Sequence, residues 1–347
     1  MIQANFHKYI LEFKRPSGTS RGVLKTKETY FLILTREGKR GIGECGVFKG
    51  LSTDDRPDYE DKLQWLCENI NLDEAILLSE LIEFPSIQFG LEQALLSLNS
   101  KTTSFELFPS DFIYNENPIP INGLIWMGDK TFMKTQIKEK IAAGFSCIKM
   151  KIGAIDFEEE LRLLAYIRSE FSPEEIELRV DANGAFTPKD ALEKLKQLSA
   201  FHLHSIEQPI KQGQWQEMAE LCEHTPLPIA LDEELIGVFS VTEKEKLLQT
   251  IQPQYIILKP SLVGGIIGSN EWISIAEKNN IGWWITSALE SNIGLNAIAQ
   301  WTYTLQSNMP QGLGTGGLFT NNFESPLQVE NGALKYNTSL SWDFNLK

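Results

Sequence analysis

The sequence predicts an α/β protein, a modified TIM barrel of the (β/α)7β type with an α+β capping domain. The main observation is a repeat in which apolar runs each end in a charged residue, at Lys151, Asp181, Glu207, Asp232 and Lys259. These residues are 25 to 30 positions apart, about the length of one strand, one helix and two short loops. Strand-like patterns at both ends of the chain predict the capping domain.

The N-terminal region is predicted to be a β-meander followed by helices. Apolar and polar residues alternate through residues 1–45, with turn motifs at Pro16–Ser17–Gly18 and Glu37–Gly38. Apolar residues then recur at helical spacing between residues 58 and 100. Residues 101–120 are rich in Ser, Thr, Asn and Pro, and they are predicted to link this region to the barrel.

The barrel itself is predicted from eight strand candidates, which are residues 119–125, 147–153, 176–182, 203–208, 228–233, 255–261, 282–288 and 311–315. Helices are predicted between them, and one begins with Thr187 as its N-cap and Pro188 as its first residue. No helix is predicted after the eighth strand, and the tail is expected to return to the N-terminal region. The expected division is a capping domain of residues 1–115, joined by 320–347, and a barrel domain of residues 116–319.

Composition narrows the class of protein. The chain has 347 residues, 42% of them hydrophobic, and a net charge of −14. That acidity argues against nucleic acid and against an anionic membrane surface as partners. The N-terminus lacks the apolar segment of a signal peptide, no apolar stretch reaches the length of a membrane span, and none of the four cysteines forms a CxxC motif. We expect a cytoplasmic protein with free thiols that acts on a small molecule.

Three carboxylates are predicted to lie at one level of the barrel mouth. Asp181, Glu207 and Asp232 end three successive predicted strands, and neighbouring strands lie about 4.8 Å apart. Oxygen ligands from different strands favour Mg²⁺ over zinc. The alternative is that each acid caps the next helix or pairs with a lysine.

Three lysines are candidates for acid–base chemistry. Lys149 and Lys151 are two positions apart on one strand, so both point the same way. They are expected to face the lumen, because burying two ammonium groups against packed helices is costly. Repulsion between them and a nearby cation would lower their pKa values and suit one of them to act as a general base. Lys259 approaches from the opposite side of the mouth. The alternative for all three is a salt bridge to a ligand carboxylate.

The eighth predicted strand contains a glycine-rich segment, Gly312–Gly317, that matches the GxGxxG pattern. No helix follows it and no βαβ unit contains it, so a dinucleotide site is not expected. The glycines instead predict a close approach of the backbone to a ligand.

Together these motifs resemble the enolase superfamily, and within it the muconate lactonizing enzyme subgroup. The matching motifs are KxK at Lys149 and Lys151, DANG with Asp181 and Asn183, EQP with Glu207, DEE with Asp232, and KPSLVGG with Lys259. Enolase-type sites use a Lys or His base and a divalent cation. The resemblance implies that Asp181, Glu207 and Asp232 bind Mg²⁺, with Mn²⁺ as a substitute. It also implies that Lys151 is the acid–base group, that Lys259 faces it across the substrate, and that Lys149 and Asn183 support the ligands.

Within that subgroup the chain looks most like the o-succinylbenzoate synthases of menaquinone synthesis. The resemblance rests on INGLIWMG, TSALESNIGL and QGLGTGGLFTNN in the first, seventh and eighth predicted strands. It implies a Mg-dependent lyase that dehydrates a small-molecule carboxylate through an enediolate. Substrate contacts are expected from Arg21, Ser287, Glu290 and Gly314, and loops at Arg21–Gly22 and Phe48–Ser52 are expected to close over the mouth.

Other readings stay open at this point. A dipeptide epimerase or N-acylamino acid racemase of the same superfamily would have the same lysines and carboxylates. Such an epimerase usually carries an acidic pattern on the eighth strand to hold the substrate's amino group, and residues 311–319 contain no acid. A Schiff-base aldolase and a non-catalytic barrel are disfavoured by the complete set of three carboxylates. The sequence leaves the oligomeric state open.

Overall fold

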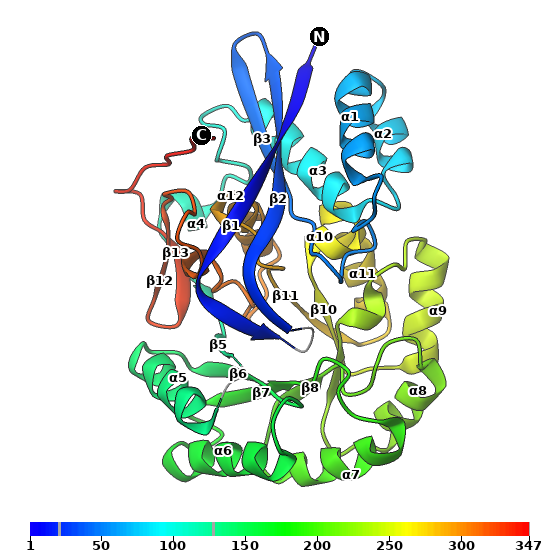
Figure 1. The fold of residues 1–347 in the computed structure, drawn as a ribbon, viewed down its shortest axis with the longest axis vertical. Coiled ribbons are helices and arrows are strands. Elements are labelled where there is room, and N and C mark those ends of the chain that lie inside the picture. The colour runs from blue at the N-terminus through cyan, green and yellow to red at the C-terminus, as the bar shows by residue number, and fades with distance from the viewer. Residues whose placement is uncertain (20–21, 127–128, 347) are drawn as a thin grey trace.

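Seven parallel strands form one curved sheet in the order of the chain. Figure 1 shows the computed structural model, which describes residues 1–19, 22–126 and 129–346. The strands are β5 (Gly123–Ile125), β6 (Cys147–Lys151), β7 (Glu177–Asp181), β8 (Ser205–Glu207), β9 (Ile229–Leu231), β10 (Tyr255–Leu258) and β11 (Gly282–Ile285). Strand order follows chain order because a helix returns the chain to the same end of the sheet after each strand. All seven carboxyl ends therefore meet at one mouth.

The sheet closes into a barrel through residues 311 and 312. Gln311 forms a parallel bridge with Ile121, and Gly312 forms one with Thr286. The predicted eighth strand, 311–315, is therefore much shorter than expected. A Cβ on Gly312 would lie 2.4 Å from Thr286 Oγ1, so only glycine permits this approach. The predicted (β/α)7β arrangement is confirmed.

The first predicted strand, 119–125, is split in the structure. Only β5 belongs to the barrel, whereas β4 (Ile119–Pro120) pairs with β13 (Ala333–Tyr336) in a separate sheet. Pro120 has no backbone N–H to donate, which restricts it to the end or the edge of a sheet. The apolar pattern of residues 119–125 is continuous, so it does not indicate that the chain leaves one sheet and joins another.

Helices cover the outside of the barrel (Figure 1). They are α5 (Lys130–Ala142), α6 (Phe157–Glu170), α7 (Pro188–Ser199), α8 (Trp215–His224), α9 (Val241–Ile251), α11 (Gly265–Lys278) and α12 (Asn292–Thr304), with the short α10 (Pro260–Val263), η1 (Glu233–Leu235) and η2 (Gly316–Leu318) at strand ends. Thr187 caps α7 as predicted, accepting a hydrogen bond from Asp190 N. Met150 and Val180 are fully buried in the core between the strands and these helices.

The capping region contains an antiparallel sheet and four helices. They are β1 (Gln3–Thr19), β2 (Gly22–Arg36), β3 (Lys39–Cys45), α1 (Tyr59–Asn69), α2 (Glu74–Glu80), α3 (Pro85–Asn99) and α4 (Asp111–Tyr114). Helix α3 lies directly on β3, because Gly43 has no side chain: a Cβ there would meet Gly90 O at 1.9 Å. Residues 101–120, which were predicted to be a linker, contain α4 and β4.

The turn predicted at Pro16–Ser17–Gly18 is wrong. Strand β1 continues to Thr19, and its pairing with β2 is irregular between Glu12 and Ser17. Proline cannot donate a ladder hydrogen bond, so it interrupts the pairing here without ending the strand.

The C-terminal tail returns to the capping sheet, as predicted. Strand β12 (Leu327–Glu330) pairs with β13, and the rings of Phe323 and Phe344 pack against Phe31 of β2 at centroid distances of 5.2 and 5.3 Å. The domain boundaries at residues 115 and 319 stay predictions. No helix of the described residues combines the length and apolar character that crossing a bilayer requires.

Candidate active site

Strand register brings the predicted charged residues to one level of the barrel mouth. Asp181 pairs with Lys151 on one side and with Glu207 on the other. Glu207 pairs in turn with Ala230, so Asp232 follows two residues beyond that level on the next strand. Because neighbouring strands are about 4.8 Å apart, side chains at these positions reach one another.

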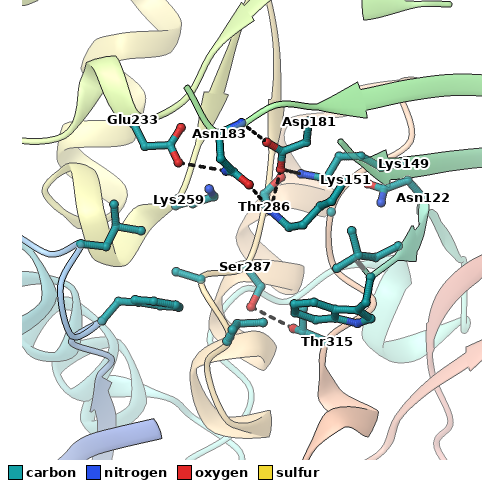
Figure 2. Close-up of a pocket in the computed structure, with 17 residues that line it drawn as sticks. Asn122, Lys149, Lys151, Asp181, Asn183, Glu233, Lys259, Thr286, Ser287 and Thr315 are labelled. Carbon is teal, nitrogen blue, oxygen red and sulfur yellow. Dashed lines mark hydrogen bonds and ion pairs between the residues drawn. The ribbon is translucent and has the colours of Figure 1, made fainter. Parts of the chain in front are cut away.

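Lysines and carboxylates form an ion-paired cluster there, and Figure 2 shows its three lysines together with Asp181. Lys149 Nζ lies 2.6 Å from Glu207 Oε2 and 3.2 Å from Asp181 Oδ2. Lys151 Nζ lies 2.9 Å from the same Asp181 oxygen and 2.7 Å from Asn183 Oδ1. Two ammonium groups therefore share one carboxylate oxygen, and Asn183 holds Lys151 in place.

The third lysine joins the cluster from the far side of the barrel. Lys259 Nζ forms an ion pair with Asp232, and it lies 3.9 Å from Glu207 Oε1. The side chains of the three acids are only 1–2% exposed. The salt-bridge alternative is thus visible in this geometry, because every acid has a lysine partner.

Burial and charge shift the pKa values of these groups in opposite directions. Burial alone lowers the pKa of Lys149 and of Lys259, but the neighbouring carboxylates outweigh it and raise both pKa values. The expected lowering assumed a nearby cation as well as the neighbouring lysine, whereas in the ion pairs of this structure the carboxylates of Glu207 and Asp181 raise the pKa of Lys149. Burial and repulsion by Asp181 raise the pKa of Glu207 well above its ordinary value.

The chemistry of the three acids fits a hard divalent cation. Glu207 Oε1 is buried and forms no hydrogen bond with any of the described residues, and a buried carboxylate oxygen without a hydrogen bond is costly. As they stand, no three His, Cys, Asp or Glu side chains of the described residues are arranged to hold a metal ion. Lysine ammonium groups contact the carboxylate oxygens instead. A cation would have to replace those contacts at Asp181, Glu207 and Asp232.

A cavity of about 730 Å³, open solvent at its mouth included, lies beside this cluster. Its polar wall contains Lys149, Lys151 and Lys259, and apolar side chains form much of the rest. Those side chains are Phe48, Leu51, Leu124, Trp126, Ala288 and Leu289. Figure 2 shows Ser287 and Thr315 across the cavity from the lysines. The cavity therefore offers charged groups on one side, where the lysines stand beside Asp181 and Glu233, and an apolar surface on the other.

The predicted substrate contacts are only partly placed at this cavity. Ser287 lines it, whereas the fully buried Glu290 lies behind it and Gly314 is not part of its wall. Arg21 lies outside the described residues. The predicted loop Phe48–Ser52 contributes Phe48 and Leu51 to the wall.

Sequence reasoning missed several wall residues, among them Asn122, Trp126, Glu233 and Thr315. Glu233 directly follows Asp232 in the DEE motif, and its Oε1 accepts a hydrogen bond of 3.0 Å from Asn183 Nδ2. Asn183 thus connects Lys151 to Glu233. The DEE motif could have pointed to Glu233, but the direction of that side chain depends on the turn that follows β9.

Comparison with known proteins places this fold and site in a family. A family model described as Enolase C-terminal domain-like matches residues 133–339. The chain is 49% identical to the o-succinylbenzoate synthase of Desulfotalea psychrophila, over 96% of this chain and 98% of the relative. The chain belongs to the enolase superfamily.

One further relative and two solved structures are also similar to this chain. The o-succinylbenzoate synthase of Vibrio cholerae is 28% identical over 94% of this chain and 93% of its own length. The crystal structure of MenC from D. psychrophila superposes with a TM-score of 0.86 at 45% identity, covering 96% of this chain and 99% of that one. Muconate lactonizing enzyme from Pseudomonas fluorescens superposes with a TM-score of 0.83 at 22% identity, covering 99% and 96%. That last likeness shows the fold alone.

Proposed function

We propose that this chain is an o-succinylbenzoate synthase of menaquinone biosynthesis. It would dehydrate 2-succinyl-6-hydroxy-2,4-cyclohexadiene-1-carboxylate to 2-succinylbenzoate and water. The observation that carries the proposal is the cavity, in which lysines face a wall without a carboxylate from the eighth barrel segment. Gly312 and Thr315 represent that segment in the wall. The 49% identical synthase from D. psychrophila supports the same assignment.

Asp181, Glu207 and Asp232 are proposed to hold Mg²⁺, with Mn²⁺ as a substitute. Their buried oxygens suit a hard cation, and the unpartnered Oε1 of Glu207 is a vacant donor atom within the set. A divalent cation supplies positive charge that makes a proton next to a carboxylate more acidic. Dicarboxylate substrate, metal and lysines would then balance one another's charge in a largely buried site.

Lys151 is proposed to perform both proton transfers. Its Nζ takes the proton from C1 of the ring, the C1–H electron pair becomes the new C1–C6 double bond, and the hydroxyl leaves from C6. The proton held by Lys151 then joins that hydroxyl, so water is released and the ring is aromatic. Asn183 and Asp181 orient the amine through the contacts at 2.7 and 2.9 Å.

Lys259 is proposed to hold the negative charge that develops on the substrate carboxylate. Its ammonium approaches from the end of β10, four strands from Lys151 in the sheet order. The pKa of Lys259 is raised, so the group stays protonated at neutral pH. Trp126 and Leu289 provide an apolar surface for the carbon ring, which gains by burial there.

The decisive experiment is a substrate comparison. Purified protein with Mg²⁺ should convert the cyclohexadiene carboxylate to 2-succinylbenzoate, measured as loss of the diene absorbance. Ala-Glu dipeptides and N-acylamino acids should be incubated in parallel in D₂O, with NMR detection of α-proton exchange. Rapid exchange of the dipeptides together with an untouched cyclohexadiene would replace the synthase by an epimerase.

Metal dependence is tested separately. Activity should disappear after dialysis against EDTA and return with Mg²⁺ or Mn²⁺, and calorimetry should show binding of one cation per chain. The variant Asp232→Asn should weaken that binding with little change in the unfolding midpoint. Full activity after exhaustive chelation would exclude the metal assignment and leave the fold assignment intact.

A further inference from the structure

A buried lysine of the capping sheet lines a second cavity, which shares Phe48 with the active-site cavity. Lys27 of β2 is 6% exposed, and none of the described residues forms a hydrogen bond with its Nζ. Burial lowers the pKa of Lys27, and attraction by Glu44 and Glu290 opposes that effect. An isolated buried ammonium group is costly, so its presence calls for an explanation beyond packing.

The ammonium group and the carboxylate of Glu290, which follows β11 of the barrel, both lie close to Gly46. A Cβ on Gly46 would lie 3.6 Å from Lys27 Nζ and 3.8 Å from Glu290 Oε1. Both charged groups therefore adjoin the same point of the backbone between the cap and the barrel. Glu44, which is also fully buried, is the second acid in this cluster.

Glu290 connects the ends of two neighbouring barrel strands. Its Oε1 accepts a hydrogen bond of 2.5 Å from Ser261 Oγ, and its Oε2 accepts one of 2.5 Å from Ser287 Oγ. Ser261 is two residues beyond Lys259. Ser287 lies in the cavity wall and accepts a hydrogen bond of 2.9 Å from Thr315. One carboxylate thus holds both the Lys259 strand end and the wall opposite the lysines.

The residue before Glu290 has an unusual backbone conformation. Leu289 has φ of +64° and lines the cavity. A leucine in the left-handed region costs on the order of 1–2 kcal/mol, and it persists only where its surroundings hold it. The two serine hydrogen bonds to Glu290 provide that restraint.

We propose that Lys27 is a positioning residue for the active site. Its charge offsets the buried carboxylate of Glu290, which in turn holds Ser287, Leu289 and the strand end of Lys259 in the geometry that receives substrate. Lys27 does not line the active-site cavity, so it would act from the capping sheet across the interface with the barrel. The capping region would thereby contribute to turnover through charge as well as by covering the mouth.

The test is Lys27→Met, which keeps the length of the side chain and removes its charge. The matched control is Lys25→Met, an exposed position on the same strand. We expect kcat/KM for the cyclohexadiene substrate to fall at least tenfold in Lys27→Met, with the larger part in KM, because the cavity wall loses its definition. Mg²⁺ affinity should stay within twofold, and Lys25→Met should match the wild type in every measurement.

Compensation distinguishes positioning from a merely structural effect. The double variant Lys27→Met/Glu290→Gln removes the charges of Lys27 and Glu290 together and leaves Glu44 with its helix-start hydrogen bonds, so it should recover part of the lost kcat/KM and exceed both single variants. Hydrogen–deuterium exchange provides a readout independent of substrate: Lys27→Met should raise exchange at residues 287–290, and the double variant should lower it again.

The inference rests on the proposed function only for its substrate, and the two can fail separately. Wild-type protein without synthase activity would reject the function, whereas the exchange measurement would still test the coupling. A folded Lys27→Met variant with wild-type kcat/KM and wild-type exchange at residues 287–290 would overturn the coupling. Losses in the double variant equal to the sum of the two single losses would do the same.

Discussion

The barrel mouth and the interface between cap and barrel both bury carboxylates, but they satisfy them differently. At the mouth, Asp181, Glu207 and Asp232 pair with lysines from the same barrel. At the interface, Glu44 and Glu92 of the capping region accept hydrogen bonds from backbone N–H groups at the starts of barrel helices. Figure 1 shows the elements concerned, with α3 of the cap beside α10 and α11.

Glu44 covers the beginning of α12. Its Oε1 lies 3.0 Å from Ser291 N, and its Oε2 lies 2.6 Å from Ser291 Oγ and 2.9 Å from Gly294 N. Thr29 donates a further hydrogen bond of 2.9 Å. The first N–H groups of a helix have no partner within the helix and carry partial positive charge, so a carboxylate there is stabilised.

Glu92 of α3 does the same for α11. It accepts hydrogen bonds of 2.5 and 3.3 Å from the backbone N of Ile266 and Ile267. Gln88, one turn earlier, donates 2.7 Å to Gly264 O. A Cβ on Gly265 would lie 2.3 Å from Glu92 Oε2, so a larger residue there would push the carboxylate away.

The lysine contacts at the mouth can be exchanged for contacts with a ligand, whereas the backbone contacts at the interface are fixed. A lysine side chain has several rotatable bonds, so its ammonium group can turn from a carboxylate of the mouth to a ligand while the backbone stays in place. Backbone N–H groups of a helix cannot move away without unwinding it. The mouth is therefore suited to chemistry, and the interface is suited to holding the cap in one position over the cavity.

The largest effect should come from the mouth. Lys151→Ala should reduce kcat by more than about 10⁴-fold, because one amine serves both proton steps and loss of a general base alone costs about 10²–10⁴-fold. Folding and cation binding should be retained, as judged by circular dichroism and calorimetry. The control is Lys211→Ala, an exposed lysine. A tenth of the wild-type rate in Lys151→Ala would require another base.

The arrangement of the barrel mouth could be predicted from the sequence, because strand order equals chain order in this barrel. A charged residue at the end of each apolar run recurs at one period, and that period places Lys151, Asp181 and Glu207 side by side. Side-chain alternation likewise separates Lys149 from Met150. The positions of these residues follow from periodicity alone, whereas their roles stay predictions.

The contacts between cap and barrel could not be predicted, because they join residues that are far apart in the sequence and follow no repeat. Glu44 is 247 residues from Ser291, and Glu92 is 174 residues from Ile266. In the cavity wall, side-chain directions depend on single turns: Asn183 has φ of +44° and Leu289 has φ of +64°. Such turns change the direction of a side chain in a way that a strand or helix pattern does not predict. For this reason Glu290, which was expected to contact substrate, is not part of the cavity wall.

The next effect should come from the interface, on stability. Glu44→Gln should lower the free energy of unfolding by about 2–4 kcal/mol, because the amide cannot accept hydrogen bonds at both positions and Lys27 loses an opposite charge. Urea denaturation followed by tryptophan fluorescence measures it. Glu37→Gln, an exposed change in the turn before β3, is the control. An unchanged unfolding midpoint in Glu44→Gln would show that water replaces these contacts without loss.

The smallest effect concerns pH and the second interface carboxylate. Burial raises the pKa of Glu92 from its ordinary value of 4.5 to about 7, although hydrogen bonds from Ile266 N and Gln88 oppose the shift. Between these values the folded protein binds a proton that the unfolded chain releases. Stability from Glu92 is therefore fully present below pH 4.5, falls as the pH rises, and reaches its lower limit above pH 7.

Glu92→Gln should remove this dependence, because the amide does not titrate. The shift corresponds to on the order of 3 kcal/mol, so wild type should lose up to that much stability relative to Glu92→Gln between pH 5 and pH 8. Asp54 and Glu160, with pKa values raised by burial to about 6 and 7, give the same sign in both proteins and cancel in the difference. Glu277→Gln, exposed on α11, serves as the control. If the free energy of unfolding changed with pH in the same way in wild type and Glu92→Gln, the start of α11 would stabilise the charged form of Glu92 as strongly as water does. The interface would then be insensitive to pH.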